Sequence, residues 1–155
     1  MKYSRLTKEQ FEELQQEFIN FLATQTITAD EWATLKKEKP EVAEQELDVF
    51  SDLVWEGVLS AAKYVEHISP QNIHLFALKE DHMHVISIKI ENPIDVTTTD
   101  GFNWLRENLM DDSVKFTQGK KDYSEDKSLD KFKLIQQGAN ITKGQLYEYL
   151  FKLIN

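Results

Sequence analysis

The stretch NIHLFALKEDHMHVI, residues 72–86, predicts a β-hairpin. Apolar residues recur at every second position on either side of Glu80 and Asp81, as expected for two strands that each bury one face. A two-residue turn at Glu80-Asp81 places His74 and His84 on opposite faces, because side chains alternate along a strand. In that register one face collects Ile73, Leu75, Ala77, His84, Ile86, Ile88 and Ile90. We expect this face to line the core.

The same hairpin holds three of the four histidines, which raises the alternative of a metal-binding protein or metal-dependent enzyme. A three-residue turn at residues 79–81 would bring the three imidazoles to one face, but it would mix isoleucines with polar residues and leave a poorer core. The candidate groups for this alternative are His74, His82, His84, Asp81 and Glu46. No HExxH motif accompanies them, so we favour the two-residue turn and expect no metal site.

Strand and helix patterns continue on both sides of the hairpin. YVEHI at residues 64–68 adds a third strand of an antiparallel meander, and VKFTQ at 114–118 is a possible fourth. Helices are expected over residues 8–23, 29–37, 40–61, 100–110, 120–137 and 143–153. The predicted class is α+β, a small antiparallel sheet packed with N-terminal and C-terminal helices in a single globular domain over residues 1–155.

Three short stretches carry the signature of a capping box with a hydrophobic staple: LTKEQF, ITADEW and ITKGQL. In each, a Thr is followed three residues later by Gln or Glu. We therefore expect Thr7, Thr28 and Thr142 each to cap the start of a helix.

Composition narrows the function more than any motif does. The 155 residues include no cysteine, which excludes disulfides and thiol catalysis and suits a reducing, cytoplasmic setting. The formal charge of −9 argues against nucleic acid and anionic membranes as partners. No phosphate-binding loop, dinucleotide fingerprint or nucleophile elbow is present. We therefore expect no cofactor and lean toward a protein that is not an enzyme.

The predicted helix over residues 40–61 carries an unusual distribution of charge. One side is an acidic stripe with no Lys or Arg within it, made of Glu41, Glu44, Asp48, Asp52 and Glu56. The opposite side is a broad apolar arc, made of Val42, Val49, Phe50, Leu53 and Val54. Glu46 falls inside that arc, where a salt bridge to a neighbouring Lys or Arg is the simplest expectation. Like charges four residues apart disfavour an isolated helix, which suggests that the stripe serves a partner.

Two tryptophans lie off the predicted core faces of their helices. Trp55 falls beside the acidic stripe, and Trp104 projects away from the apolar side of the helix at residues 100–110. Exposed tryptophan is costly unless something covers it, either another segment of this chain or a partner. The hypothesis is a docking surface for another protein, or for self-association, whose residues are Glu44, Asp48, Asp52, Trp55 and Trp104.

The run EKPEVAEQELDVFSDLVWEGVL, residues 38–59, followed by YVEHISPQNIHLF, residues 64–76, resembles a family of small Bacteroidota proteins classified only as a domain of unknown function. The resemblance covers nearly the whole chain. It implies a bacterial cytoplasmic protein with no assigned activity, and it assigns a role to no residue.

Overall fold

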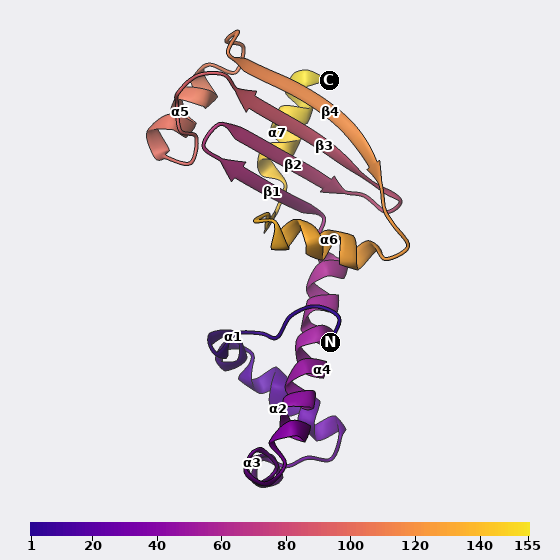
Figure 1. The fold of residues 1–155 in the computed structure, drawn as a ribbon. Coiled ribbons are helices and arrows are strands. Elements are labelled where there is room, and N and C mark those ends of the chain that lie inside the picture. The colour runs from indigo at the N-terminus through magenta and orange to yellow at the C-terminus, as the bar shows by residue number, and fades with distance from the viewer. The chain divides into compact units, whose positions relative to one another are not determined.

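The computed structural model covers residues 1–155 and contains seven helices and a five-stranded antiparallel sheet, which confirms the α+β class. The chain divides into two compact units, residues 1–60 and 61–155. The first is helical, and the second contains the whole sheet (Figure 1). That the two units form the single domain expected from the sequence stays a prediction.

The helical unit is held together by aromatic rings. Its helices are α1 (Lys8–Glu13), α2 (Gln15–Thr24), α3 (Ala29–Glu38) and α4 (Pro40–Ala61). The helix predicted over residues 8–23 is interrupted at Leu14, whose backbone leaves the helical conformation. Phe11 before the interruption and Phe18 after it both pack on Phe50 of α4, with ring centroids 6.0 and 5.0 Å away. The interruption therefore separates two segments that share one aromatic core.

The sheet extends the predicted meander at both edges. Its strands are β1 (Tyr64–Ser69), β2 (Asn72–Leu78), β3 (His82–Ile90), β4 (Val114–Asp122) and β5 (Asn140–Thr142), in the order β4-β3-β2-β1-β5. The three-stranded meander and the fourth strand are confirmed, but β4 continues through residues 119–122, so the helix expected from residue 120 begins only at Lys127. The sequence did not predict β5, a strand of three residues that pairs with the outer edge of β1.

The hairpin has the predicted register. Ile73 pairs with Ile88, and Ala77 pairs with His84, so Glu80 and Asp81 form the turn. The amide of Lys79 donates to the carbonyl of His82 across it, at 2.9 Å. The apolar residues of the face predicted to line the core are buried in both strands, and His84 on the same face is half-buried.

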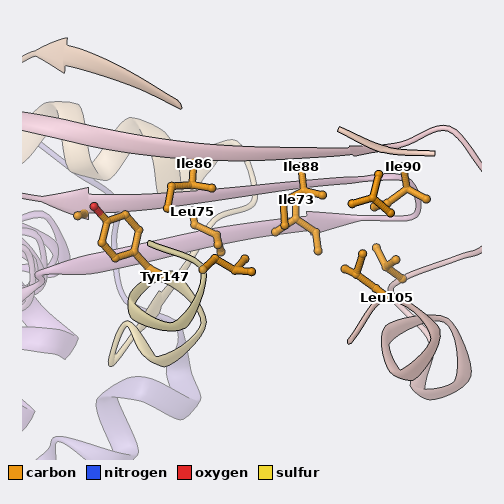
Figure 2. Packing of buried hydrophobic residues seen from close by; sticks show 11 residues of the cluster. Ile73, Leu75, Ile86, Ile88, Ile90, Leu105 and Tyr147 are labelled. Atoms are coloured by element: carbon orange, nitrogen blue, oxygen red, sulfur yellow. The ribbon is translucent and has the colours of Figure 1, made fainter. Parts of the chain in front are cut away.

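Helices cover the two faces of the sheet unequally. On one face the isoleucines of β2 and β3 pack with α5 (Thr99–Glu107) and α7 (Gln145–Ile154). Figure 2 shows these side chains pointing toward Leu105 of α5 and Tyr147 of α7. On the other face a smaller cluster joins Val65 and Met83 to Leu134 of α6 (Lys127–Gln136). The face under α5 and α7 holds the larger core.

Two of the three predicted caps are confirmed. The hydroxyl of Thr7 accepts from the amide of Gln10 in a complete capping box, and that of Thr28 accepts from the amide of Glu31. The prediction for Thr142 is wrong, because this residue lies in β5 and pairs with Tyr64. The local sequence pattern favours a helix start at this position, but pairing with β1 satisfies the backbone hydrogen-bonding groups instead.

Gly144, rather than Thr142, is the N-cap residue of α7. Its φ of 81° lies in the left-handed region that favours glycine. A Cβ at this position would approach the ring of Tyr64 to 2.5 Å. Gly144 thus permits both the turn from β5 into α7 and the close approach of α7 to β1.

Candidate functional site

The acidic stripe of α4 lies under the N-terminal segment, residues 1–6. The carboxylate of Asp52 accepts from the backbone amides of Lys2 and Tyr3, at 2.7 and 2.9 Å. Next to them, the amide of Leu6 donates to the hydroxyl of Ser51, which is fully buried, at 3.1 Å. An extended segment with no strand partner thus finds hydrogen-bond acceptors on a helix.

Cationic side chains of the same segment pair with the stripe. Arg5 Nε lies 2.7 Å from Asp48 Oδ1, and Lys2 Nζ lies 2.9 Å from Glu56 Oε1. Hydrogen bonding to Asp48 raises the pKa of Arg5. The like charges that made the isolated helix unfavourable are therefore offset within the chain.

The hydroxyl of Tyr3 donates to Glu56 at 2.5 Å, and the ring is buried. Burial, and then the bond to the Glu56 carboxylate, raise the pKa of Tyr3. Of the predicted docking residues on the stripe, Glu44 is exposed, whereas Asp48 and Asp52 are half-buried and hydrogen-bonded to the N-terminal segment.

Neither tryptophan is a freely exposed ring. Trp55 is half-buried, and its indole N–H donates to the carbonyl of Ser4 at 3.1 Å, so it helps to hold the N-terminal segment. Trp104 is half-buried against the larger core cluster of the other unit. The two rings lie in different units, and each contacts residues of its own unit.

The apolar arc of α4 is only partly buried. Phe50 is 4% exposed, but Val49 and Leu53 are 51% and 56% exposed. We call Val49 and Leu53 the outer patch. The aromatic core on one side of α4 and the N-terminal segment on another leave this side uncovered. The acidic stripe borders the patch, because Asp52 follows Val49, and Glu56 follows Leu53, by three residues.

Glu46 does not form the salt bridge expected for it. Its Oε2 atom is buried and has no hydrogen-bond partner. Glu46 precedes Val49 by three residues, and around the helix axis it lies between the aromatic core and the outer patch. A carboxylate oxygen in this position costs desolvation energy without a compensating bond.

The histidines occupy separate environments. His74 Nδ1 lies 2.9 Å from the hydroxyl of Ser87 on one face of the sheet, and His84 Nδ1 lies 2.6 Å from the hydroxyl of Tyr147 on the other. His82 pairs with Asp81 at the turn, at 2.6 Å. No group of three or more His, Cys, Asp and Glu side chains is placed to hold a metal ion. The geometry gives no support to the metal-binding alternative.

The second surface of interest is a pocket of about 730 Å³ in the unit 61–155, which we call the sheet pocket. It lies between α5 and α7 on the face of the sheet that carries the larger core. Glu66 of β1 lines it and is half-buried, and burial raises the pKa of this carboxyl group. The sequence prediction missed this residue.

A signal for Glu66 is nevertheless present in the sequence. In YVEHI, Tyr64, Glu66 and Ile68 point to one face of the strand, so an acid stands between two large side chains on the core side. A comparable signal lies before the first helix. The cationic residues Lys2 and Arg5 could have been predicted to pair with the acidic stripe.

Comparison with known families shows that the chain belongs to a family of unknown function, DUF6495, which matches it over residues 1–155. The resemblance noted over residues 38–76 is thereby confirmed as a relationship to a family without an assigned role. Neither the curated proteins nor the solved structures include a match to the chain. No helix combines the length and the apolar character needed to cross a bilayer.

Proposed function

We propose that this chain is a non-enzymatic, cytoplasmic protein-interaction module whose docking surface is the outer side of α4. The observation that carries the proposal is the outer patch. Val49 and Leu53 expose half or more of their surface one helical turn apart, in the middle of a helix of 22 residues. Apolar surface rimmed by polar residues is typical of sites where proteins associate.

The acidic stripe supports a partner of opposite charge. Residues 1–60 contain 6 Lys and Arg against 13 Asp and Glu, a net of −7. Like charges on the two sides of an interface oppose association, so this balance disfavours a second copy as the partner. The partner that fits is a segment with apolar side chains for the outer patch and basic side chains for the exposed carboxylates of this unit, such as Glu44, because Arg5 and Lys2 already pair with Asp48 and Glu56.

The N-terminal segment illustrates the same chemistry within the chain. Its Lys2 and Arg5 side chains pair with stripe carboxylates, and its backbone amides bind Asp52. The stripe therefore accepts an extended basic segment in the geometry seen here. A partner would add to this arrangement on the side of Val49 and Leu53, which the segment leaves exposed.

The test uses two synthetic amphipathic helical peptides with leucines on one face. One has lysines beside the leucines, and the other has glutamates at the same positions. Titrated into the isotope-labelled full chain, the lysine peptide should bind about 10-fold more tightly at low salt and should shift amide resonances around Val49 and Leu53. Raising the salt concentration should reduce the difference.

A matched pair of variants locates the site. Leu53→Gln should weaken binding of the lysine peptide about 10-fold, since it removes one of two apolar contacts. Met110→Gln is the control, because Met110 is 72% exposed in the other unit. Equal effects of the two substitutions, or resonance shifts that avoid α4, would contradict the proposal.

A further inference from the structure

The sheet pocket has the size and walls of a small-molecule site. Its volume of about 730 Å³ lies within the range of roughly 300–1,000 Å³ that such sites occupy. Ile73 and Ile88 form its floor on the sheet, and Leu105 and Leu146 are among the apolar residues contributed by α5 and α7. Most of these walls come from strands and helices of one unit.

Glu66 is the charged residue that the strands contribute to this pocket. In the ladder it stands between Leu75 of β2 and Asn140 of β5. It points to the same face as the buried Leu75, which belongs to the core cluster under α5 and α7. No hydrogen bond or ion pair joins the carboxylate of Glu66 to another residue of the chain. Burial raises the pKa of this carboxyl group.

The other charged residues of the pocket stand at its mouth. Arg106 and Glu107 at the end of α5, and Lys143 before α7, are all exposed. Neither Arg106 nor Lys143 pairs with Glu66, although each carries a charge of the sign that would neutralise it. Within the apolar interior, the half-buried charge is therefore negative and lacks a counter-charge.

We propose that the sheet pocket binds a small organic amine, with the apolar part of the ligand between α5 and α7 and its ammonium group donating hydrogen bonds to the carboxylate of Glu66. An unpaired carboxylate in an apolar site is costly, and a cationic donor offsets that cost through a charge-assisted hydrogen bond. A neutral alcohol of the same shape would fill the same volume but would bring no charge. A carboxylate ligand would place like charges together.

This site is separate from the docking surface proposed on α4, because every residue that lines it lies between Glu66 and Leu150. The two proposals can therefore fail independently. Loss of peptide binding at Leu53 says nothing about the pocket, and amine binding says nothing about α4.

The test uses three probes that share an apolar body: phenylbutylamine, phenylbutanol and phenylbutyrate. Calorimetric titration of the full chain at neutral pH should give the amine an affinity about 10-fold or more above that of the alcohol, with the carboxylate weakest. Resonance shifts should map to β1, α5 and α7. Absence of binding by all three probes, equal affinities, or tightest binding of the carboxylate would each overturn the proposal.

Two substitutions separate a role of Glu66 from a general charge effect. Glu66→Gln keeps the shape of the side chain, and it should bring the ratio of amine to alcohol affinity close to one while alcohol binding persists. Glu107→Gln removes an exposed carboxylate at the mouth and should leave the ratio near its original value. If Glu66→Gln retains the preference for the amine, or if Glu107→Gln abolishes it equally well, the assignment to Glu66 is wrong.

Discussion

The carboxylates of α4 and the carboxylate of Glu66 have opposite environments. Asp48 and Asp52 lie on a helix surface and are engaged by Arg5 and by backbone amides of the N-terminal segment. Glu66 lies on the covered face of a sheet and has no partner in the chain. A carboxylate matched by its own chain contributes to folding, whereas an unmatched one in a pocket disfavours the empty state and is available to a ligand.

The comparison predicts different consequences for stability. Removing a matched carboxylate should destabilise the helical unit, because amide donors lose their acceptors. Removing the unmatched one should not destabilise the sheet unit, because no bond is lost.

The largest expected effect is that of Asp52→Ala. It leaves two backbone amides, those of Lys2 and Tyr3, without their acceptor and should lower the free energy of unfolding by about 1–3 kcal/mol. Chemical denaturation measures the loss, and hydrogen exchange of residues 2–6 should become faster. Glu41→Ala is the control, because Glu41 is exposed on the same helix. A loss no greater than that of Glu41→Ala would show that the N-terminal segment is held by other contacts.

A smaller loss is expected for Trp55→Phe. The substitution keeps an aromatic ring but removes the N–H that donates to the carbonyl of Ser4, which should cost about 1 kcal/mol. Thermal unfolding would detect it, together with faster exchange near Ser4. If the N-terminal segment stays equally protected, then Trp55 contributes by packing alone.

The pair of Arg5 and Asp48 should contribute less. The Arg5 and Asp48 side chains are 38% and 29% exposed, so solvent screens their attraction, and a double-mutant cycle should give a coupling of about 0.2–1 kcal/mol. The coupling should shrink as salt is raised. A coupling that is insensitive to salt would mean that the pair is better shielded than its exposure indicates.

The smallest effect, and the one of opposite sign, is expected for Glu66→Gln. Burial raises the pKa of Glu66 above its ordinary value of 4.5, so the folded state retains a proton that the unfolded state has lost as pH rises. Stability of the native chain therefore falls between pH 4.5 and the raised pKa and stays lower above it.

At pH 7 Glu66→Gln should raise the free energy of unfolding by about 0.5 kcal/mol or less, a modest gain because the group is partly solvated. Denaturation at several pH values should show that the gain vanishes below the ordinary pKa of the carboxyl group. A net loss of stability at pH 7 would reveal a favourable partner for Glu66 and would remove the contrast with Asp52.

Sequence pattern was sufficient for the hairpin. Strand side chains alternate strictly, and a two-residue turn admits one register, so the burial of Ile73 and Ile88 and the separation of His74 from His84 followed from residues 72–86 alone. The caps at Thr7 and Thr28 were equally local, because capping depends on three or four adjacent residues.

Which side of α4 is buried could not be predicted from neighbouring residues. The apolar arc of α4 is wide enough for the helix to pack in more than one rotation about its axis. The observed rotation is set by Phe50, which joins the aromatic core, and by Asp52, which binds the N-terminal segment. Val49 and Leu53 were left exposed as a result.

The amino-acid sequence by itself determined the α+β class, the hairpin register, the helix α4 and the absence of thiol chemistry, since each depends on composition or on neighbours along the chain. Tertiary structure alone decided that Thr142 joins a strand, that α4 presents Val49 and Leu53, and that Glu66 borders a pocket. The physical reason is that these three outcomes depend on which distant segment supplies a hydrogen-bond partner or excludes water. The spacing of nearby residues places Glu66 on the core side of its strand, but it does not show that a pocket opens there.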